Sequence, residues 1–353
     1  MSKVDGLISI RDDWSIKLGE HIACDGELLD DESFLIISHA HGDHYRENKV
    51  LNTWRQKKPI IVTPETRDLL DCFNLNMATN PGGVLTQKFG ESITHQTKNG
   101  EAVNIRLLEN RHILGSAQIE IEYKDGLKVG YSGDFNEDID EFIDVDYLVL
   151  DSTYGDKNDN KHWTRDDCIN ELAMRIKEAY SKGPVNLLGS PGLVQLVLSE
   201  LSSFWNEVEY VYTLQTPLIG FSKVYDKYGY DQPKIIGPKD EELLFSAKRA
   251  KRYVRLGYTM KDFKKDNPAG TTFELKNFAP DNNIPIKPKK DNPNFFRVSL
   301  SCHAMGNTVM EYVHKVNPKF VVTDGARKPK SAKALAKKIE KELRIPSKSS
   351  LDL

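Results

Sequence analysis

Short blocks of apolar residues, separated by polar ones, fill the first 150 residues and predict a strand-rich region. The blocks that predict strands are residues 7–10, 21–24, 34–38, 59–63, 103–109, 117–123, 127–133 and 146–152. Within one of them, "QIEIEY" (118–123) alternates apolar and polar positions with period two, which is typical of a strand exposed on one face. Residues 64–74 are predicted to form a helix, because proline stands in the first turn and acids follow early.

The pattern changes after a polar stretch near residue 165, where longer amphipathic segments begin to alternate with short apolar ones. The predicted elements are helices 168–183 and 192–205 around a strand 185–190, a basic helix 241–257, a linker 278–294 rich in Pro, Asn and Lys, helices 308–317 and 330–343, and a strand 319–325. Alternating helices and strands build a parallel sheet. We therefore predict an α/β protein with a strand-rich first part (1–165), an inserted α/β part (166–295) and a return to the first part (296–353).

Composition places the chain among globular proteins with a charged surface, since 39% of its 353 residues are hydrophobic and 29% are charged. No apolar run approaches the roughly 20 residues that cross a bilayer. The first residues carry acids and a tryptophan, unlike a secretion signal. The four cysteines are far apart and form no CxxC pair, which favours free thiols in a reducing compartment. We expect a cytoplasmic protein that does not enter a membrane.

Charge is unevenly divided along the chain. Residues 1–165 hold 18 Lys and Arg against 30 Asp and Glu, whereas the remainder holds 31 basic and 22 acidic residues. Acid in one part suits metal binding and base in the other suits an anionic partner. Ordinary variation of surface charge would give the same asymmetry, so both interpretations stay open.

The most specific pattern is "HAHGDH", directly after the apolar block 34–38. His39 and His41 are two apart, so in extended backbone their side chains project from the same face. Gly42 permits a bend that redirects Asp43 and His44. Imidazole and carboxylate are ligands that suit Zn²⁺, and a carboxylate can bridge two ions. The alternative is a histidine-rich surface loop, which would not explain the buried strand in front of it.

A metal site needs more ligands than one loop supplies. His112 in "RHILGS" precedes a predicted strand, and Asp134 in "YSGDF" follows another. Taken alone, a His or an Asp at a strand end is more often structural than functional. Strand ends are nevertheless where α/β proteins build their sites, so both are candidates to complete the metal shell.

In this order, "HAHGDH", "RHILGS" and "YSGDF" resemble the signature of the metallo-β-lactamase superfamily, and Asp25 in "CDGELL" resembles its early aspartate. Asp151 in "VLDSTYG" and His303 in "SLSCHAMGN" resemble two motifs of the β-CASP nucleases in that superfamily, and "GSPGLVQLVLSEL" is similar to a helix start in their insertion. Ribonuclease J and the archaeal and bacterial mRNA 3′-end processing factors are nucleases of this kind. The resemblance implies an αββα sandwich with an inserted α/β β-CASP domain.

The resemblance also implies a two-metal phosphodiesterase, with zinc expected and Mn²⁺ as an alternative. The implied ligands are His39, His41 and His112 for one ion, Asp43 and His44 for a second, and Asp134 as a bridge. A metal-activated hydroxide would attack phosphorus, with Asp43 among the catalytic residues. His303, oriented by Asp151, would give a proton to the leaving oxygen, and Asp25 would support the site.

Two departures from the family pattern concern the second ion and the substrate. Asp324 in "KFVVTDG" stands where the ribonucleases carry a ligating histidine. It is either a ligand of the second ion or the turn after a strand. In the β-CASP motif, glycine is usual at the position of Cys302. Members that bind a phosphate group of the substrate carry histidine at the position of Ser299. Substrate contacts are expected from Ser301, Lys248 and Arg252, although the last two also suit a solvated helix face.

The favoured function is a metal-dependent nuclease whose partner is nucleic acid, with RNA preferred over DNA. The alternatives are a small-molecule metallo-hydrolase that cleaves a thioester, lactone or lactam, and an inactive scaffold subunit of an RNA-processing complex. Endo- or exonuclease action stays open. So does the oligomeric state, for which a homodimer is one option.

Overall fold

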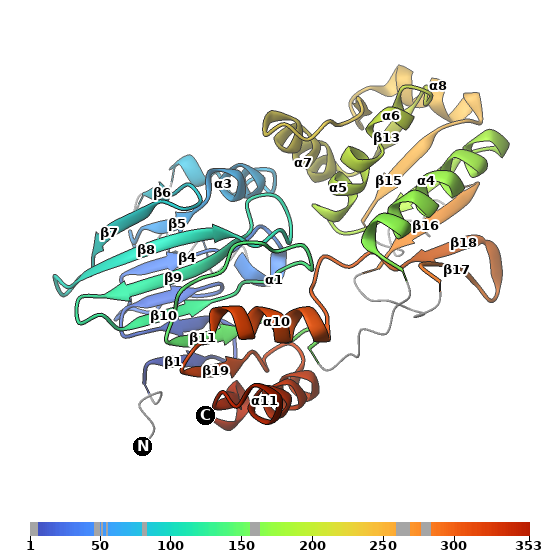
Figure 1. The fold of residues 1–353 in the computed structure, drawn as a ribbon. Coiled ribbons are helices and arrows are strands. Elements are labelled where there is room, and N and C mark those ends of the chain that lie inside the picture. The colour runs from blue at the N-terminus through green and yellow to red at the C-terminus, as the bar shows by residue number, and fades with distance from the viewer. Residues whose placement is uncertain are drawn as a thin grey trace. The chain divides into compact units, whose positions relative to one another are not determined.

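A computed structural model describes residues 6–45, 50, 52–53, 56–79, 83–155, 163–258, 269–276 and 284–353 (Figure 1). They form a mixed α/β fold, which confirms the predicted fold class. The chain divides into two compact units, one made of Met1–Asp159 with Cys302–Leu353 and the other of Asn160–Ser301. Within the described ranges, no helix has the length and apolar character needed to span a membrane.

The first sheet of the first unit contains β1 (Ile8–Ile10), β2 (Ile16–Leu18), β3 (Ile22–Cys24), β4 (Phe34–Ile36), β5 (Ile60–Val62) and β6 (Val84–Thr86), side by side in this order. The pairs from β3 to β6 are parallel, so their carboxyl ends lie at one edge. The short helix α1 (Gly42–Tyr45) follows β4, and α3 (Pro64–Asp71) follows β5. Thr63 caps α3 by accepting a hydrogen bond from Thr66 N, and Pro64 occupies its first turn. A 3₁₀ turn, η1 (Met77–Thr79), comes next.

The second sheet of this unit has the order β20-β19-β11-β10-β9-β8-β7. Its strands are β7 (Ser92–Gln96), β8 (Ala102–Glu109), β9 (Ala117–Tyr123), β10 (Lys128–Tyr131), β11 (Tyr147–Leu150), β19 (Phe320–Thr323) and β20 (Ser347–Ser349). The helices α10 (Gly306–Val316) and α11 (Pro329–Leu343) flank β19 in the chain. The 3₁₀ turn η2 (Ser350–Asp352) follows β20. Strands β10, β11, β19 and β20 run parallel, so the residues that follow the first three are brought to the same edge.

The two sheets pack face to face. Side chains of the first sheet, among them Ile22 and Ile36, share one buried cluster with Ile119 and Val149 of the second sheet. The neighbouring Leu148 and Leu150 of β11 point to the opposite face, where they pack with side chains of α10 and α11. This layer of helices explains why β11 and β19 are apolar on both faces.

The second unit contains one further sheet, of order β14-β13-β15-β12-β16-β18-β17. Its strands are β12 (Val185–Leu188), β13 (Val211–Thr213), β14 (Ile235–Ile236), β15 (Val254–Gly257), β16 (Thr271–Leu275), β17 (Ile286–Lys289) and β18 (Asn292–Val298). Its helices are α4 (Arg165–Lys182), α5 (Leu193–Glu200), α6 (Ser202–Trp205), α7 (Thr216–Lys227) and α8 (Glu241–Ala250). All strands pair in parallel except β17 with β18. The predicted α/β alternation therefore does build a parallel sheet.

The prediction that 118–123 is exposed on one face is wrong. Gln118 is fully buried and Glu120 is 9% exposed. Gln118 gives hydrogen bonds to the carbonyls of Glu109 and Glu141, and Glu120 pairs with Arg106 at 2.7 Å. A polar strand face can be buried when such partners satisfy it, and polarity alone does not reveal them.

Three predictions in the second unit also need correction. Residues 241–257 are not one helix, because α8 ends at Ala250 and Val254–Gly257 form a buried central strand. Residues 284–294 of the expected linker belong largely to the antiparallel pair β17 and β18, while 278–283 lie outside the described residues. The helix expected over 192–205 is broken at Leu201. In each case pairing or packing partners distant in sequence decide the structure.

Candidate functional site

The loop after β4 lies over a buried aspartate. Strands β3 and β4 are parallel neighbours, so Asp25, just beyond β3, meets Ser38, just beyond β4. Asp25 accepts hydrogen bonds from the backbone N of Ser38 at 2.8 Å and from its Oγ at 2.7 Å. Its Oδ2 also lies 2.7 Å from Nδ1 of His44. Asp25 therefore fixes both ends of the segment that carries the histidines.

Three imidazole nitrogens converge above this loop. Nδ1 of His41 lies 3.2 Å from Nε2 of His39 and 3.0 Å from Nε2 of His112. Zinc bonds to imidazole of about 2.0–2.1 Å in a tetrahedron separate the ligand atoms by about 3.3 Å. The two separations measured from His41 are close to this value, and all three ligand atoms lie within 4.8 Å of one another, so the three side chains could hold one metal ion.

Neighbouring groups fix which nitrogen faces the centre. Nδ1 of His112 donates to the carbonyl oxygen of Cys302 at 2.7 Å, and Nδ1 of His39 lies 3.0 Å from the hydroxyl of Ser38. The Ser38 hydroxyl donates to Asp25, so it accepts from His39. Each Nε2 is thereby left with a lone pair toward the centre.

Burial favours the uncharged form of these ligands. It lowers the pKa of His39 well below its ordinary value, with further lowering from His44, His112 and His41. It also lowers the pKa of His112 strongly, together with His303 and His41. Neutral imidazole is the form that binds metal, so the protein environment prepares these side chains as ligands.

The His112 loop is held by helix α3. Gly115 has a positive φ of 77°, and a Cβ there would lie 2.6 Å from the backbone N of Thr66. The carbonyl of Gly115 accepts hydrogen bonds from the hydroxyls of Thr63 at 2.7 Å and Thr66 at 2.9 Å. The start of the helix therefore positions a ligand almost 50 residues further along the chain.

Asp134, just beyond β10, lies close to several of the imidazoles. Its Oδ2 lies 4.0 Å from Nε2 of both His39 and His112, and 3.1 Å from Nε2 of His44. Burial raises the pKa of Asp134, but His44 and His303 outweigh it and hold the pKa well below the usual range. The groups of described residues with geometry for a metal ion are His39–His41–His112, His39–His44–Asp134 and His112–Asp134–His303.

Asp151 and His303 form a pair beside these ligands. Asp151 follows β11, and its Oδ2 lies 3.0 Å from Nδ1 of His303. Its Oδ1 accepts from the backbone N and the hydroxyl of Thr153 at 2.8 and 2.7 Å. Nε2 of His303 faces Asp134 Oδ2 at 3.8 Å. Burial lowers the pKa of His303, but Asp134 and Asp151 outweigh it and raise the pKa.

Asp43 and Asp324 share a partner that the sequence did not suggest. The guanidinium of Arg327 donates to Oδ2 of Asp43 at 2.9 Å and to Oδ2 of Asp324 at 3.1 Å. Neither aspartate is part of the metal-binding groups found among the described residues. Of the residues predicted for the second ion, His44 and Asp134 belong to one of these groups, whereas Asp43 and Asp324 contact Arg327. Arg327 was missed because one arginine in the polar loop after β19 carries no distinctive local pattern.

The predicted substrate contacts belong to the second unit. Lys248 lies in the last turn of α8 and is exposed. Arg252 donates to the carbonyl of Ser181 at 3.1 Å. Arg255, in the same basic run, is buried in β15. Ser301 is the last residue of this unit. The basic run is therefore divided between a helix, a loop and a core strand.

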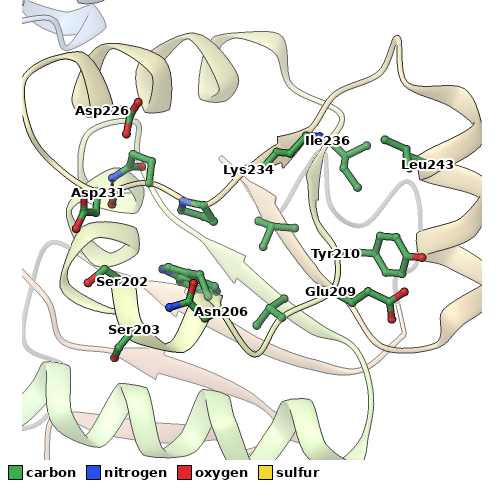
Figure 2. Close-up of a pocket in the computed structure, with 15 residues that line it drawn as sticks. Ser202, Ser203, Asn206, Glu209, Tyr210, Asp226, Asp231, Lys234, Ile236 and Leu243 are labelled. Carbon is green, nitrogen blue, oxygen red and sulfur yellow. Dashed lines mark hydrogen bonds between the residues drawn. The ribbon is translucent and has the colours of Figure 1, made fainter.

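A hollow of about 600 Å³ lies within the second unit. Figure 2 draws the side chains that line it. Among the side chains around it are Glu209, Asp226, Asp231, Lys234 and Tyr210. None of the predicted site residues lines it, and its charges are mixed. The convergent polar groups described above are other residues, which belong to the first unit.

Several known proteins are similar to part of the chain. Transcription termination factor FttA of Methanosarcina mazei is 27% identical over 194 residues, which cover 47% of this chain and 30% of that protein. The factor of the same name from Methanothermobacter thermautotrophicus is 29% identical over 200 residues, or 49% of this chain and 31% of that protein. The match thus spans less than a third of the length of these relatives.

An uncharacterized protein of Acidianus ambivalens, named for its place in a "lig 3′region", is 28% identical over 97 residues. These cover 27% of this chain and 69% of that protein. No protein-family model matches the chain.

Proposed function

We propose that the chain is a metal-dependent nuclease that hydrolyses phosphodiester bonds, with RNA as its preferred substrate. The observation that carries the proposal is the convergence of three imidazole groups, with Nε2 of His39 and of His112 both within 3.2 Å of Nδ1 of His41, beside the Asp151–His303 pair. A ligand set and a proton donor side by side are what metal-assisted hydrolysis requires.

The residues around the centre have different proposed roles. A divalent ion held by His39, His41 and His112 would polarise the phosphate and lower the pKa of a water molecule. Zinc is the ion we favour, because the ligand separations match its bond lengths, and Mn²⁺ is the alternative. Asp134 lies close enough to accept the proton of the attacking water.

His303 is the proposed donor to the leaving oxygen. Its Nδ1 faces Asp151, so Nε2 is the nitrogen directed toward Asp134 and the substrate. The carboxylate fixes the ring orientation and raises the pKa of His303, with help from Asp134, against the effect of burial. A protonated imidazole near neutral pH can then give up its proton as the oxygen leaves.

RNA is favoured over DNA by the relatives. Similar proteins named transcription termination factor match about half of this chain. The motifs around His39, His112, Asp134, Asp151 and His303 further support a fold of the metallo-β-lactamase type with a β-CASP insertion. The exposed Lys248 and the neighbouring Arg252 are proposed to contact the nucleic-acid backbone.

The test is incubation of the purified chain with end-labelled RNA and single-stranded DNA in the presence of Zn²⁺ or Mn²⁺. Wild-type protein is expected to cleave RNA faster than DNA. His41→Ala should abolish cleavage, because it removes the nitrogen that both other ligands face. His314→Ala is the matched control, since His314 is an exposed histidine of α10.

Other outcomes would support other functions. Turnover of thioester, lactone or lactam substrates with intact nucleic acid would indicate a small-molecule hydrolase. Binding of RNA without cleavage under every metal would indicate a scaffold subunit. Faster cleavage of DNA would keep the nuclease proposal and reverse its substrate preference.

A further inference from the structure

The carboxylates expected to hold a second ion already share a cation. Nε of Arg327 donates to Asp43 Oδ2 at 2.9 Å, and Nη2 donates to the backbone oxygen of Asp43 at 3.1 Å. Nη1 donates to Asp324 Oδ2 at 3.1 Å. Asp43 lies in α1, which follows β4 of the first sheet, and Asp324 lies just beyond β19 of the second, so one guanidinium links segments that follow strands of both sheets of the first unit.

This guanidinium is held in place on several sides. Its side chain is 14% exposed, against 46% for Asp43 and 6% for Asp324. The ring of Trp14 lies 5.5 Å from its central carbon. Oδ1 of Asp324 accepts the backbone N of Ala326 at 2.9 Å, which fixes the turn that carries Arg327. An arginine in this setting keeps its charge under all ordinary conditions.

Arg327 also interacts electrostatically with Asp134. Although burial opposes the charge of Arg327, Asp134 is the strongest of the acidic groups that raise its pKa, ahead of Tyr131, Asp324 and Asp43. Its charge therefore acts on the same acids that a second ion would use. A divalent ion at Asp43 and Asp324 would have to displace Arg327 or lie beside it against charge repulsion.

We propose that Arg327 takes the place of the second metal ion, so that the chain binds one divalent ion and uses a guanidinium as the other electrophile. The catalytic part of this inference rests on the proposed nuclease function. Three of the five N–H groups are used in the contacts above, so within the described part of the chain one on Nη1 and one on Nη2 can donate to a phosphate oxygen. Asp43 and Asp324 then act as positioning residues for Arg327 and not as metal ligands.

One competing arrangement uses His44. Its Nε2 lies 3.1 Å from Asp134 Oδ2 and 3.7 Å from Asp43 Oδ2, and His39, His44 and Asp134 together have metal-binding geometry. In that group, however, Nε2 of His39 is the same atom that faces His41 in the first set. A second ion at His44 would thus lack a third ligand of its own unless Asp43 or Asp324 left Arg327.

Metal counting tests the inference without relying on activity. The full chain is loaded with Zn²⁺, passed through metal-free buffer, and analysed by native mass spectrometry and by elemental analysis. We expect one zinc per chain for the wild type, and for Arg327→Lys, which keeps the positive charge. Arg327→Ala releases both carboxylates and is expected to raise the count toward two at saturating zinc.

Arg67→Ala is the matched control, because Arg67 pairs with Asp68 on α3 and lies outside the site. It should retain one zinc and full cleavage. In the cleavage assay Arg327→Ala should lose about 100- to 1,000-fold in kcat, the effect typical of removing one charge-stabilising donor, and Arg327→Lys should recover part of it.

The outcomes separate this inference from the proposed function. Two zinc ions in the wild type would overturn the inference and leave the nuclease proposal intact. One zinc ion with no nucleic-acid cleavage would support the metal count and end the nuclease proposal. Full activity of Arg327→Ala with one zinc would overturn the catalytic role of the guanidinium. If Arg327→Ala does not fold, as judged by circular dichroism, the wild-type count and Arg327→Lys still decide the question.

Discussion

Two groups of residues in the first unit, the imidazole side (His39, His41 and His112) and the carboxylate side (Asp43 and Asp324), use polar residues in opposite ways. On one side, His39 and His112 are backed by an uncharged hydroxyl and an uncharged carbonyl, and their free nitrogens converge with His41. On the other side, two carboxylates are joined by Arg327. The imidazole side is prepared for a cation, whereas the carboxylate side already has one. Residue type alone therefore does not define a metal site, since the donors must also be free of other partners.

The largest expected effect comes from removing the ion of the imidazole side. Treatment with a strong chelator should abolish cleavage and lower the free energy of unfolding, by about 2.7 kcal/mol relative to protein with free zinc at 100 times its Kd. Re-addition of zinc should restore both. His112→Ala, which lacks a ligand, should be inactive and show no change in melting temperature with chelator. An equal shift in both proteins would place the stabilising ion elsewhere.

The next effect separates proton donation from metal binding. His303→Ala should lower kcat by about 100- to 10,000-fold, the range for loss of a general acid, while zinc binding stays unchanged. The measurement is a pair of assays, cleavage of labelled RNA and zinc content of the same sample. Loss of zinc from His303→Ala would show instead that His303 is a ligand, in line with the His112–Asp134–His303 group.

The smallest effect compares the supports of the two sides. Ser38→Ala removes the hydroxyl that orients His39 and should weaken zinc binding by about 10- to 100-fold. Asp43→Asn keeps the shape of the carboxylate and should change zinc affinity by less than about threefold, because Asp43 serves Arg327. Competition with a zinc-binding dye measures both. A larger loss in Asp43→Asn than in Ser38→Ala would reverse the assignment of the two sides.

The sequence was most informative where function is local. The spacing of His39, His41 and His44 after a buried strand predicted that they cluster, and parallel pairing of β10, β11 and β19 explains why Asp134, Asp151 and Asp324 lie at one edge. The class α/β followed from the alternation of apolar blocks. These are properties of short segments and of strand direction, which periodicity reports directly.

Other features depend on partners that no short segment reveals. The contact of Arg327 with Asp43 joins residues that are 284 apart in sequence, so no local pattern could predict it. Arg255 looked like part of a basic helix and is instead part of a core strand between β12 and β13. Gln118 and Glu120 looked exposed and are buried with partners. Each error arose because tertiary contacts outweighed local preference.

The carbonyl of Cys302, which fixes the tautomer of His112, has a consequence for biosynthesis. It belongs to the segment in which the chain re-enters the first unit, 190 residues after the histidine that it orients. On the ribosome, the whole second unit emerges before this carbonyl, His303 and Arg327 exist. His39, His41 and His112 are therefore made before the carbonyl that orients His112, while some 140 residues of the second unit are made and folded. A chain that stops before Cys302 therefore contains His39, His41 and His112 without the carbonyl that orients His112.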